Sequence, residues 1–181
     1  AGKNANLKSV TYTNEGNQSV VIRTNGGDLV VDAGNATVDH YGAANYVNIE
    51  NVYKDSFHEY GVAAVVRIAQ GHFVAEATAK VINLNVASSD VTITETDGAK
   101  VVGYSKDSES VTVKVNGTEK EVTEIKDEAA AKTESENSEV IAEGGVAEVN
   151  GIQSKTIYAA VNMAKENNTV ILLDDISITT E

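Results

Sequence analysis

Short runs of β-type sequence follow one another from Leu7 to about Ile93. Aliphatic residues alternate with polar ones or form brief apolar runs, and Gly, Asn, Asp and Ser separate the runs at intervals of about 8 to 12 residues. None of the separators has room for a long helix. Such spacing is typical of a sandwich, a barrel or a parallel β-helix. The pattern predicts strands at Lys8–Thr13, Ser19–Thr24, Asp28–Ala33, Ala36–His40, Tyr46–Val52, Ala63–Ala69, His72–Ala75, Lys80–Asn85 and Val91–Glu95.

A faint internal repeat favours the parallel β-helix. The stretch Tyr41–Ile49 aligns with Tyr60–Ile68 at an offset of 19, and a second alignment at an offset of 44 places Leu29 over Phe73. If one coil takes about 19 to 22 residues, these offsets are one coil and two. Stacked parallel coils then place Ile49 beside Ile68 on a shared ribbon. The alternative is an antiparallel β-sandwich.

Local composition and hydrophobic pattern divide the chain into four parts: coils over 1–95, a hairpin extension over 96–124, an acidic segment, predicted as a linker or excursion, over 125–145, and a closing unit over 146–181. Asn116-Gly117 separates Val111–Val115 from Thr118–Thr123, and Asn-Gly supplies the two positive φ angles of a type I′ hairpin turn. Asp97-Gly98 predicts an earlier hairpin between Val91–Glu95 and Lys100–Tyr104. These predictions make the fold mainly β with hairpin excursions.

The acidic segment and the closing unit differ in design. Residues 119–143 hold nine acidic residues and three Lys, with no apolar stripe, so 125–145 is predicted to be a mobile linker or an exposed excursion. In the closing unit Ser154 is the expected cap of a helix whose apolar face is Ile157, Ala160, Val161 and Ala164. Strands at Thr169–Leu173 and Ile176–Thr179 follow. We expect this short helix to cap the exposed core at a coil end.

The segment KTIYAAVNMAKENNTVILLDDI, residues 155–176, resembles the opening unit of bacterial surface proteins with a right-handed parallel β-helix, in the pectate-lyase-like superfamily. The shared pattern is x-A-V-x-x-A-K-x-x-x-T-V-x-L-L, and it departs at Asn167-Asn168, where the family commonly has Gly-Asp. The resemblance implies right-handed coils, secretion and a place on the cell surface within a longer chain. That family contains adhesins, polysaccharide lyases and hydrolases, so fold alone does not settle activity.

The composition of the chain limits the classes of partner that it can bind. The chain has 26 Val against 5 Leu, with 16 Thr, which fits a mainly β fold. A formal charge of −13 repels nucleic acid and anionic lipid headgroups. No apolar run approaches the roughly 20 residues of a membrane span, so we expect no membrane insertion. The chain has no Cys, which excludes disulfides and thiolate metal sites.

Candidate ligand-binding residues gather around two Tyr-Gly pairs. If the offset of 19 is one coil, Tyr41 and Tyr60 lie in adjacent coils roughly 5 Å apart. Together with His58 and Glu59, they are suited to hold a sugar ring by stacking and hydrogen bonds. The other interpretation is a Tyr-Gly turn used twice, with the rings packed on the loop. Arg67, on an apolar strand, is either an outward salt-bridge residue or a fifth site residue.

Catalytic and metal signals are weak. A glycosidase needs two carboxylates about 5 to 9 Å apart, but any acidic domain offers several candidates. The chain has only two Arg for the cation of a polysaccharide lyase, and its three His lack helical metal-ligand spacing. We therefore assign no catalytic residue, no metal and no cofactor. The carboxylate candidates are Asp32, Asp39, Glu50, Glu59 and Glu76.

The sequence therefore favours a non-catalytic binding or adhesion module of a larger bacterial surface protein, located outside the cell. It would present an acidic β-helix face to a glycan or to a host or cell-surface protein. One alternative is a fragment of a polysaccharide lyase or glycoside hydrolase. The other is a structural spacer domain.

Overall fold

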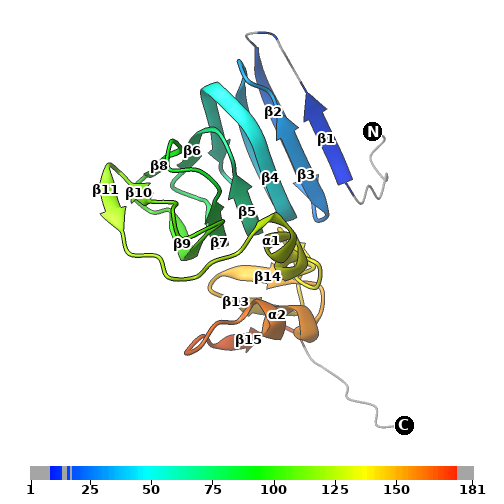
Figure 1. Cartoon of the computed structure of the whole chain (residues 1–181). Coiled ribbons are helices and arrows are strands. Elements are labelled where there is room, and N and C mark those ends of the chain that lie inside the picture. The colour runs from blue at the N-terminus through cyan, green and yellow to red at the C-terminus, as the bar shows by residue number, and fades with distance from the viewer. Residues whose placement is uncertain (1–8, 14–15, 17, 175–181) are drawn as a thin grey trace.

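The chain folds as a parallel β-solenoid of about five turns that carries a small helix-and-sheet unit on its side (Figure 1). This computed structural model describes residues 9–13, 16 and 18–174, without the side chains of 53–55. The solenoid strands are β1 Ser9–Thr13, β2 Ser19–Asn25, β3 Asp28–Asp32, β4 Thr37–Glu59, β5 Val62–Ile68, β6 Gly71–Ala75, β7 Lys80–Val86, β8 Thr92–Glu95, β9 Lys100–Lys106, β10 Val113–Val115 and β11 Thr118–Lys120. The remaining elements are α1 Glu128–Ser135, β12 Val140–Ile141, β13 Ala147–Val149, β14 Ile152–Ser154, α2 Ile157–Met163 and β15 Val170–Leu172.

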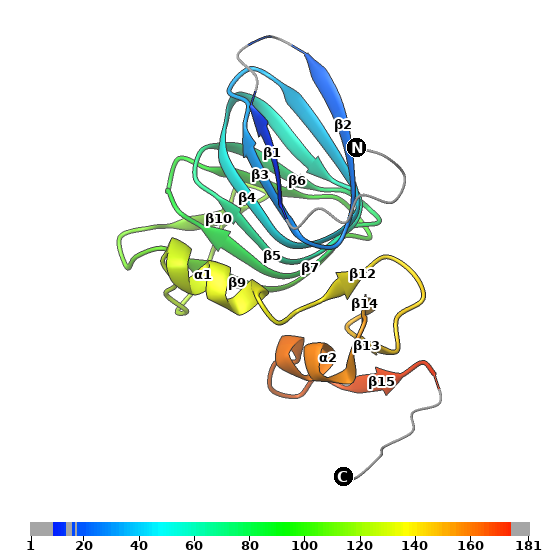
Figure 2. The ribbon, with the colours of Figure 1, turned by 90° about the vertical axis from the view of Figure 1, so that its right-hand side faces the viewer.

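Neighbouring coils pair in parallel, as the repeat predicted. Ile49 of β4 lies opposite Ile68 of β5, and the offset of 19 holds along that ladder. The single long strand β4 pairs with β2 and β3 on one side and with β5 and β6 on the other, so it contributes to two successive coils. Figure 2 shows the stacked strands bending together around each turn. This topology excludes the antiparallel sandwich.

The second alignment, at an offset of 44, is wrong as a two-coil period. Leu29 lies opposite Val47, and Val47 lies opposite Val66, so two coils on this row take 37 residues. Phe73 belongs to a different row, between Phe57 and Ile93. The similarity between these stretches reflects only that both place apolar side chains in the same core.

Alternation of side chains builds that core. In β3, Leu29 and Val31 are fully buried while their neighbours are only partly covered, because successive strand residues point to opposite faces. The corner after Tyr41 requires glycine: Gly42 has φ +102°, and a Cβ there would lie 2.0 Å from the Thr24 carbonyl oxygen. Only a residue without a side chain lets the coils stack so closely at this corner.

The coils continue past residue 95. The hairpin predicted at Asp97-Gly98 is wrong, because β8 pairs in parallel with β6 and β9 pairs in parallel with β7. Gly98, at φ +97°, turns a coil corner instead. The hairpin at Asn116-Gly117 is confirmed: β10 and β11 are antiparallel, and the two turn residues have φ of 50° and 76°.

The acidic segment is docked, which corrects the prediction of a mobile linker or exposed excursion. Asp127 caps α1 by accepting a hydrogen bond from the Ala130 amide, and Ala131 and Ser135 are fully buried. The helix lies against β4 and β5. The buried residues of α1 are small, and many of its contacts are ion pairs. The sequence therefore shows no apolar stripe that would have predicted this packing.

The closing unit is an antiparallel sheet in the order β12-β14-β13-β15, with α2 upon it. Thr156, not Ser154, caps α2. The helix buries Ala159, Ala160 and Met163, while Val161, assigned to the apolar face, is 55% exposed. The predicted strand Ile176–Thr179 lies outside the described residues.

This unit lies beside the coils and not over a coil end, which corrects the prediction that the short helix caps the exposed core. An outer cluster joins side chains of β4, β5 and β7 to side chains of α1, β12, β13, β14 and α2, and Figure 2 shows the unit on one flank of the stack. Met163 is the contribution of α2, whose other contacts are with its own sheet. The cluster comprises Ala43, Tyr46, Ala64, Val65, Ile82, Ala131, Val140, Val149, Ile152 and Met163.

Candidate functional site

A polar and aromatic surface runs across the outward side of β2, β4 and the end of β6. Strand alternation sends His40, Phe57 and Glu59 into the core, where each is fully buried. Their neighbours therefore point outward on the same part of the coil. We call this surface the tyrosine–histidine face, and it consists of Arg23, Tyr41, Ser56, His58, Tyr60 and Glu76.

Two stacked tyrosines form the centre of the face. The rings of Tyr41 and Tyr60 lie 4.6 Å apart between centroids and 6° from parallel, because one coil separates them. The Arg23 guanidinium lies 5.0 Å from the centroid of Tyr41, and the His58 ring lies 6.3 Å from that of Tyr60. Arg23, Tyr41 and Tyr60 thus form a row of flat side chains along the solenoid axis, and His58 lies beside Tyr60 on the same segment of chain.

The pKa of the Tyr60 phenol lies above its usual value. Desolvation raises the pKa of Tyr60, and the negative charges of Glu76 and Asp39 raise it further. A neutral phenol offers both a donor and an acceptor to a ligand.

His58 is held by two partners on this face. Its Nδ1 lies 2.7 Å from Glu76 Oε1, and its Nε2 lies 2.8 Å from Ser56 Oγ. The His58 and Glu76 side chains are 23% and 21% exposed, so the pair is reachable from solvent. Nearby, His72 Nε2 lies 2.9 Å from Thr94 Oγ1, and burial followed by the proximity of His58 lowers the pKa of His72.

Glu59 does not belong to the exposed set. Its carboxylate oxygens lie 2.8 and 2.9 Å from His40 Nδ1, and Oε1 also accepts the Gly61 amide at 2.7 Å. His40 Nε2 in turn lies 2.6 Å from Thr24 Oγ1. This inner row occupies a coil corner inside the core, where no ligand reaches it.

Arg67 lies on a different part of the coil, beneath α1. It donates to Asp107 Oδ2 at 2.8 Å and to Asn48 Oδ1 at 3.4 Å, and Glu128 Oε2 is 3.7 Å away. The residue is 8% exposed. Of the five residues predicted as a site, the structure thus brings together Tyr41, His58 and Tyr60, buries Glu59 below them, and places Arg67 in a separate cluster.

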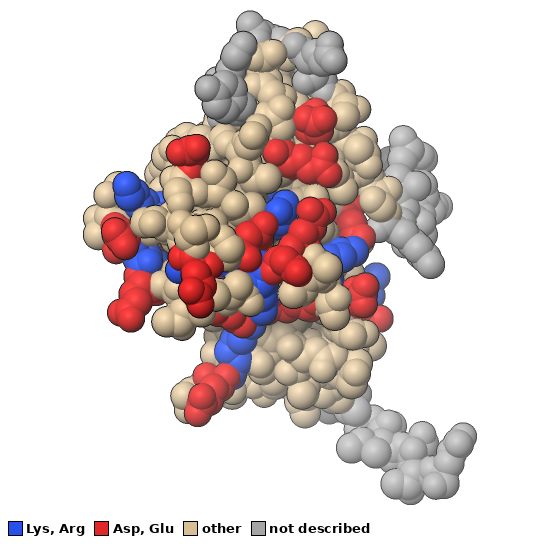
Figure 3. All heavy atoms as spheres, in the orientation of Figure 1, with Lys and Arg blue, Asp and Glu red and all other residues tan. Residues whose placement is uncertain are grey.

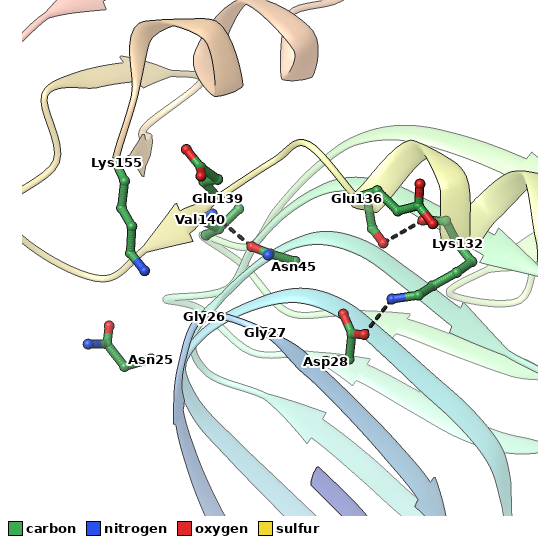
Figure 4. A pocket seen from close by; sticks show the side chains of 11 residues that line it. Asn25, Gly26, Gly27, Asp28, Asn45, Lys132, Glu136, Glu139, Val140 and Lys155 are labelled. Atoms are coloured by element: carbon green, nitrogen blue, oxygen red, sulfur yellow. Dashed lines mark hydrogen bonds and ion pairs between the residues drawn. The ribbon is translucent and has the colours of Figure 1, made fainter. Parts of the chain in front are cut away.

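A cleft of about 750 Å³ lies between the solenoid and the closing unit. In Figure 4 the side chains of Lys155, Glu139 and Asn45 surround it on one side, and Lys132 meets Asp28 on the other. Asn45 Oδ1 accepts the Val140 amide at 2.8 Å. Its lining is polar and contains no aromatic side chain, and Lys132 is already neutralised by Asp28, so the cleft provides fewer specific contacts than the tyrosine–histidine face.

Acidic and basic side chains lie close together on one side of the molecule. On the side shown in Figure 3, red and blue side chains are interleaved around the level of α1. Some of these neighbouring charges form ion pairs, since the Glu134 carboxylate pairs with both Lys126 and Lys165. Within the part of the chain that the structure describes, no cluster of three His, Cys, Asp or Glu is arranged to hold a metal, and no helix is long and apolar enough to cross a membrane.

Sequence reasoning missed the role of Ser56, and it placed Glu76 only among the carboxylates. A signal was present in the spacing. His40 and Glu59 are 19 residues apart, His58 and Glu76 are 18 apart, and both separations equal one coil. Ser56 and His58 share a face because they are two residues apart on a strand.

Compared with known proteins, the chain matches no family model, no curated protein and no solved structure, so its function rests on the geometry above.

Proposed function

We propose that this chain is an extracellular binding module of a larger bacterial surface protein and that it holds a glycan on the tyrosine–histidine face. The observation that carries the proposal is the in-register stack of Tyr41 and Tyr60 on the outside of the coils. The bacterial surface origin rests on the resemblance of residues 155–176 to β-helix surface proteins.

The chemistry of the face suits a sugar. The stack covers the facing sides of the Tyr41 and Tyr60 rings, so the row offers its ring edges for apolar contact with a pyranose and its hydroxyls for hydrogen bonds to the sugar rim. Arg23, exposed at one end of the row, and the His58–Glu76 pair at the other offer further polar contacts. Because the stack already fixes both rings, little side-chain entropy remains to be lost on binding.

The alternative of a polysaccharide lyase or glycoside hydrolase fragment receives less support. Carboxylates clustered with Arg67 in a deep groove would favour that hypothesis, whereas Arg67 pairs with Asp107 beneath α1 and is nearly buried. A pure spacer would bind no glycan at all.

The test is a panel of neutral, acidic and amino glycans together with host matrix proteins, followed by calorimetry on the best ligand. We expect Tyr60→Ala to weaken glycan binding about tenfold or more, which corresponds to about 1.4 kcal/mol. Tyr158→Ala is the matched control, because Tyr158 is 68% exposed on α2, outside the face.

Three outcomes would overturn the proposal: no glycan binds, only a protein binds, or the two tyrosine variants bind equally well. Loss of binding in Lys155→Ala with Tyr60→Ala unaffected would assign the ligand to the cleft instead.

A further inference from the structure

Three side chains of the tyrosine–histidine face are arranged as a nucleophile, a base and an orienting carboxylate. Ser56 Oγ lies 2.8 Å from His58 Nε2, and Glu76 Oε1 lies 2.7 Å from His58 Nδ1. This hydroxyl, imidazole and carboxylate order, through these two ring nitrogens, is the geometry that activates a serine on unrelated folds. We propose that Ser56, His58 and Glu76 form a site that hydrolyses small carboxylic esters, an activity that goes beyond glycan binding and does not depend on it.

The assignment requires one tautomer of His58. With Nδ1 protonated toward the Glu76 carboxylate, Nε2 keeps a lone pair that accepts the Ser56 proton. The outward position of all three residues leaves the hydroxyl partly accessible, since Ser56 is half-buried and His58 is 23% exposed. The base is thus oriented before any substrate arrives.

The backbone beside Ser56 is irregular. Val52 lies opposite Gly71, but the next pair is Ser56 with His72, so residues 53–55 have no counterpart on β6. Such bulges release backbone N–H groups from the ladder and are frequent beside active sites. N–H groups next to the nucleophile are the donors that a tetrahedral oxyanion needs.

A small pocket lies on the neighbouring coil, lined by residues opposite Val52 and Ser56 and not by Ser56, His58 or Glu76 themselves. Its volume is about 210 Å³, enough for a short acyl group, and it includes Gly71 and His72, which lie opposite Val52 and Ser56 in the ladder. The remaining lining residues are Ala69, Gln70, Ser88, Asp90 and Thr92.

The reaction balances with water as the second reactant. Ser56 Oγ attacks the ester carbonyl carbon while its proton passes to His58 Nε2. The tetrahedral adduct then collapses, the bond to the alkoxide breaks, and Nε2 returns the proton to the departing alcohol. Water attacks the acyl-serine through the same base, which releases the carboxylic acid and restores Ser56.

The chain supplies its own matched control. Thr24, His40 and Glu59 repeat the same order of groups, with distances of 2.6 and 2.8 Å, but His40 and Glu59 have no exposed surface. Because the Thr24 hydroxyl donates to the Ala43 carbonyl oxygen and the inner row is buried, we expect reactivity at the Ser56 hydroxyl and none at the Thr24 hydroxyl.

The experiment treats the full chain with a fluorophosphonate probe and follows adduct formation by intact-protein mass spectrometry and peptide mapping. We expect one adduct, on Ser56, that Ser56→Ala abolishes and Thr24→Ala retains. His58→Ala should slow labelling by about 100-fold or more, the usual contribution of a general base. The rate of 4-nitrophenyl acetate hydrolysis should rank the variants in the same way: lost in Ser56→Ala, slowed in His58→Ala and retained in Thr24→Ala.

Glu76 is a positioning residue, so its test needs a readout that stability alone would not change. Glu76→Gln should slow labelling and remove the low-field NMR resonance of the His58 Nδ1 proton, and Glu76→Asp should restore part of both. Absence of a Ser56 adduct, or an adduct that forms equally fast in His58→Ala, would overturn the proposal. Because the probe carries no sugar, either result leaves the glycan proposal to its own test.

Discussion

Two histidines in successive coils have nearly the same partners and opposite surroundings. His40 lies between Thr24 and Glu59 inside the core, and His58 lies between Ser56 and Glu76 on the outer face. The two rows differ because strand alternation turns one inward and the other outward. Identical chemistry along the repeat therefore serves the fold in one row and faces solvent in the other.

The hydrogen bonds of the two hydroxyls also distinguish the inner row from the outer row. The Thr24 hydroxyl donates to the Ala43 carbonyl oxygen at 2.5 Å, so at the contact with His40 Nε2 it acts as the acceptor. The inner hydroxyl is therefore committed to the backbone. On the outer face, the Ser56 hydroxyl lies within hydrogen-bond distance of His58 Nε2.

The largest expected effect comes from removing each carboxylate. Glu59→Ala leaves His40 buried without its partner, which should lower the free energy of unfolding by about 3–5 kcal/mol. Glu76→Ala breaks a partly exposed pair and should cost about 1 kcal/mol or less. Urea unfolding followed by circular dichroism measures both. Equal losses would show that the two rows do not differ in burial.

A second comparison concerns the glycine beside Tyr41 and the glycine of the hairpin. Gly42→Ala places a Cβ against the Thr24 carbonyl in a positive-φ corner and should cost about 3 kcal/mol or more. Gly117 also has positive φ, but nothing lies within 4 Å of a Cβ there. Gly117→Ala should therefore cost only about 1–2 kcal/mol. Urea unfolding measures the loss of stability in both variants. A larger loss in Gly117→Ala than in Gly42→Ala would contradict the close approach of the coils at Gly42.

The smallest expected effect is pH-dependent and concerns a third set of carboxylates, on α1. Burial alone would raise the pKa of Glu134, but hydrogen bonds from Lys126, Lys165 and Asn83 lower it below its usual value. A depressed folded-state pKa adds stability above the unfolded value of about 4.3, and that stability is lost as pH falls through the folded-state pKa. Amide exchange in α1 should therefore accelerate relative to the coils below about pH 4. In Glu134→Gln the contrast between pH 7 and pH 4 should shrink, and an unchanged contrast would contradict this origin.

Much of the solenoid could be predicted from the sequence, because its signals are local. Most strands from Ser9 to Glu95 follow from alternation, although β4 is one strand where two, Ala36–His40 and Tyr46–Val52, were predicted. The parallel register of Ile49 with Ile68 follows from one repeated offset. The hairpin at Asn116-Gly117 follows from turn chemistry. The corner at Gly98 was misassigned because Asp-Gly also serves a coil turn, where the next strand pairs with a distant one.

The tyrosine–histidine face and the packing of α1 against the coils were harder to predict. Both depend on which residues successive coils place side by side. Tyr41, His58 and Tyr60 were found through the offset, but the inward direction of Glu59 depends on its place in the pleat. The docking of α1 was missed because its contacts are polar and come from Asn83 and Lys165, far away in the chain. No periodic apolar pattern marks such an interface.

The most direct measurement of the central claim follows the histidine side-chain NMR signals while the best glycan from the panel is titrated into the labelled chain. The account predicts that the His58 signals and those of the Tyr60 ring shift with saturation, while the His40 signals stay in place. Shifts confined to Lys155 and Asn45 in the cleft, or a moving His40 with a fixed His58, would contradict it.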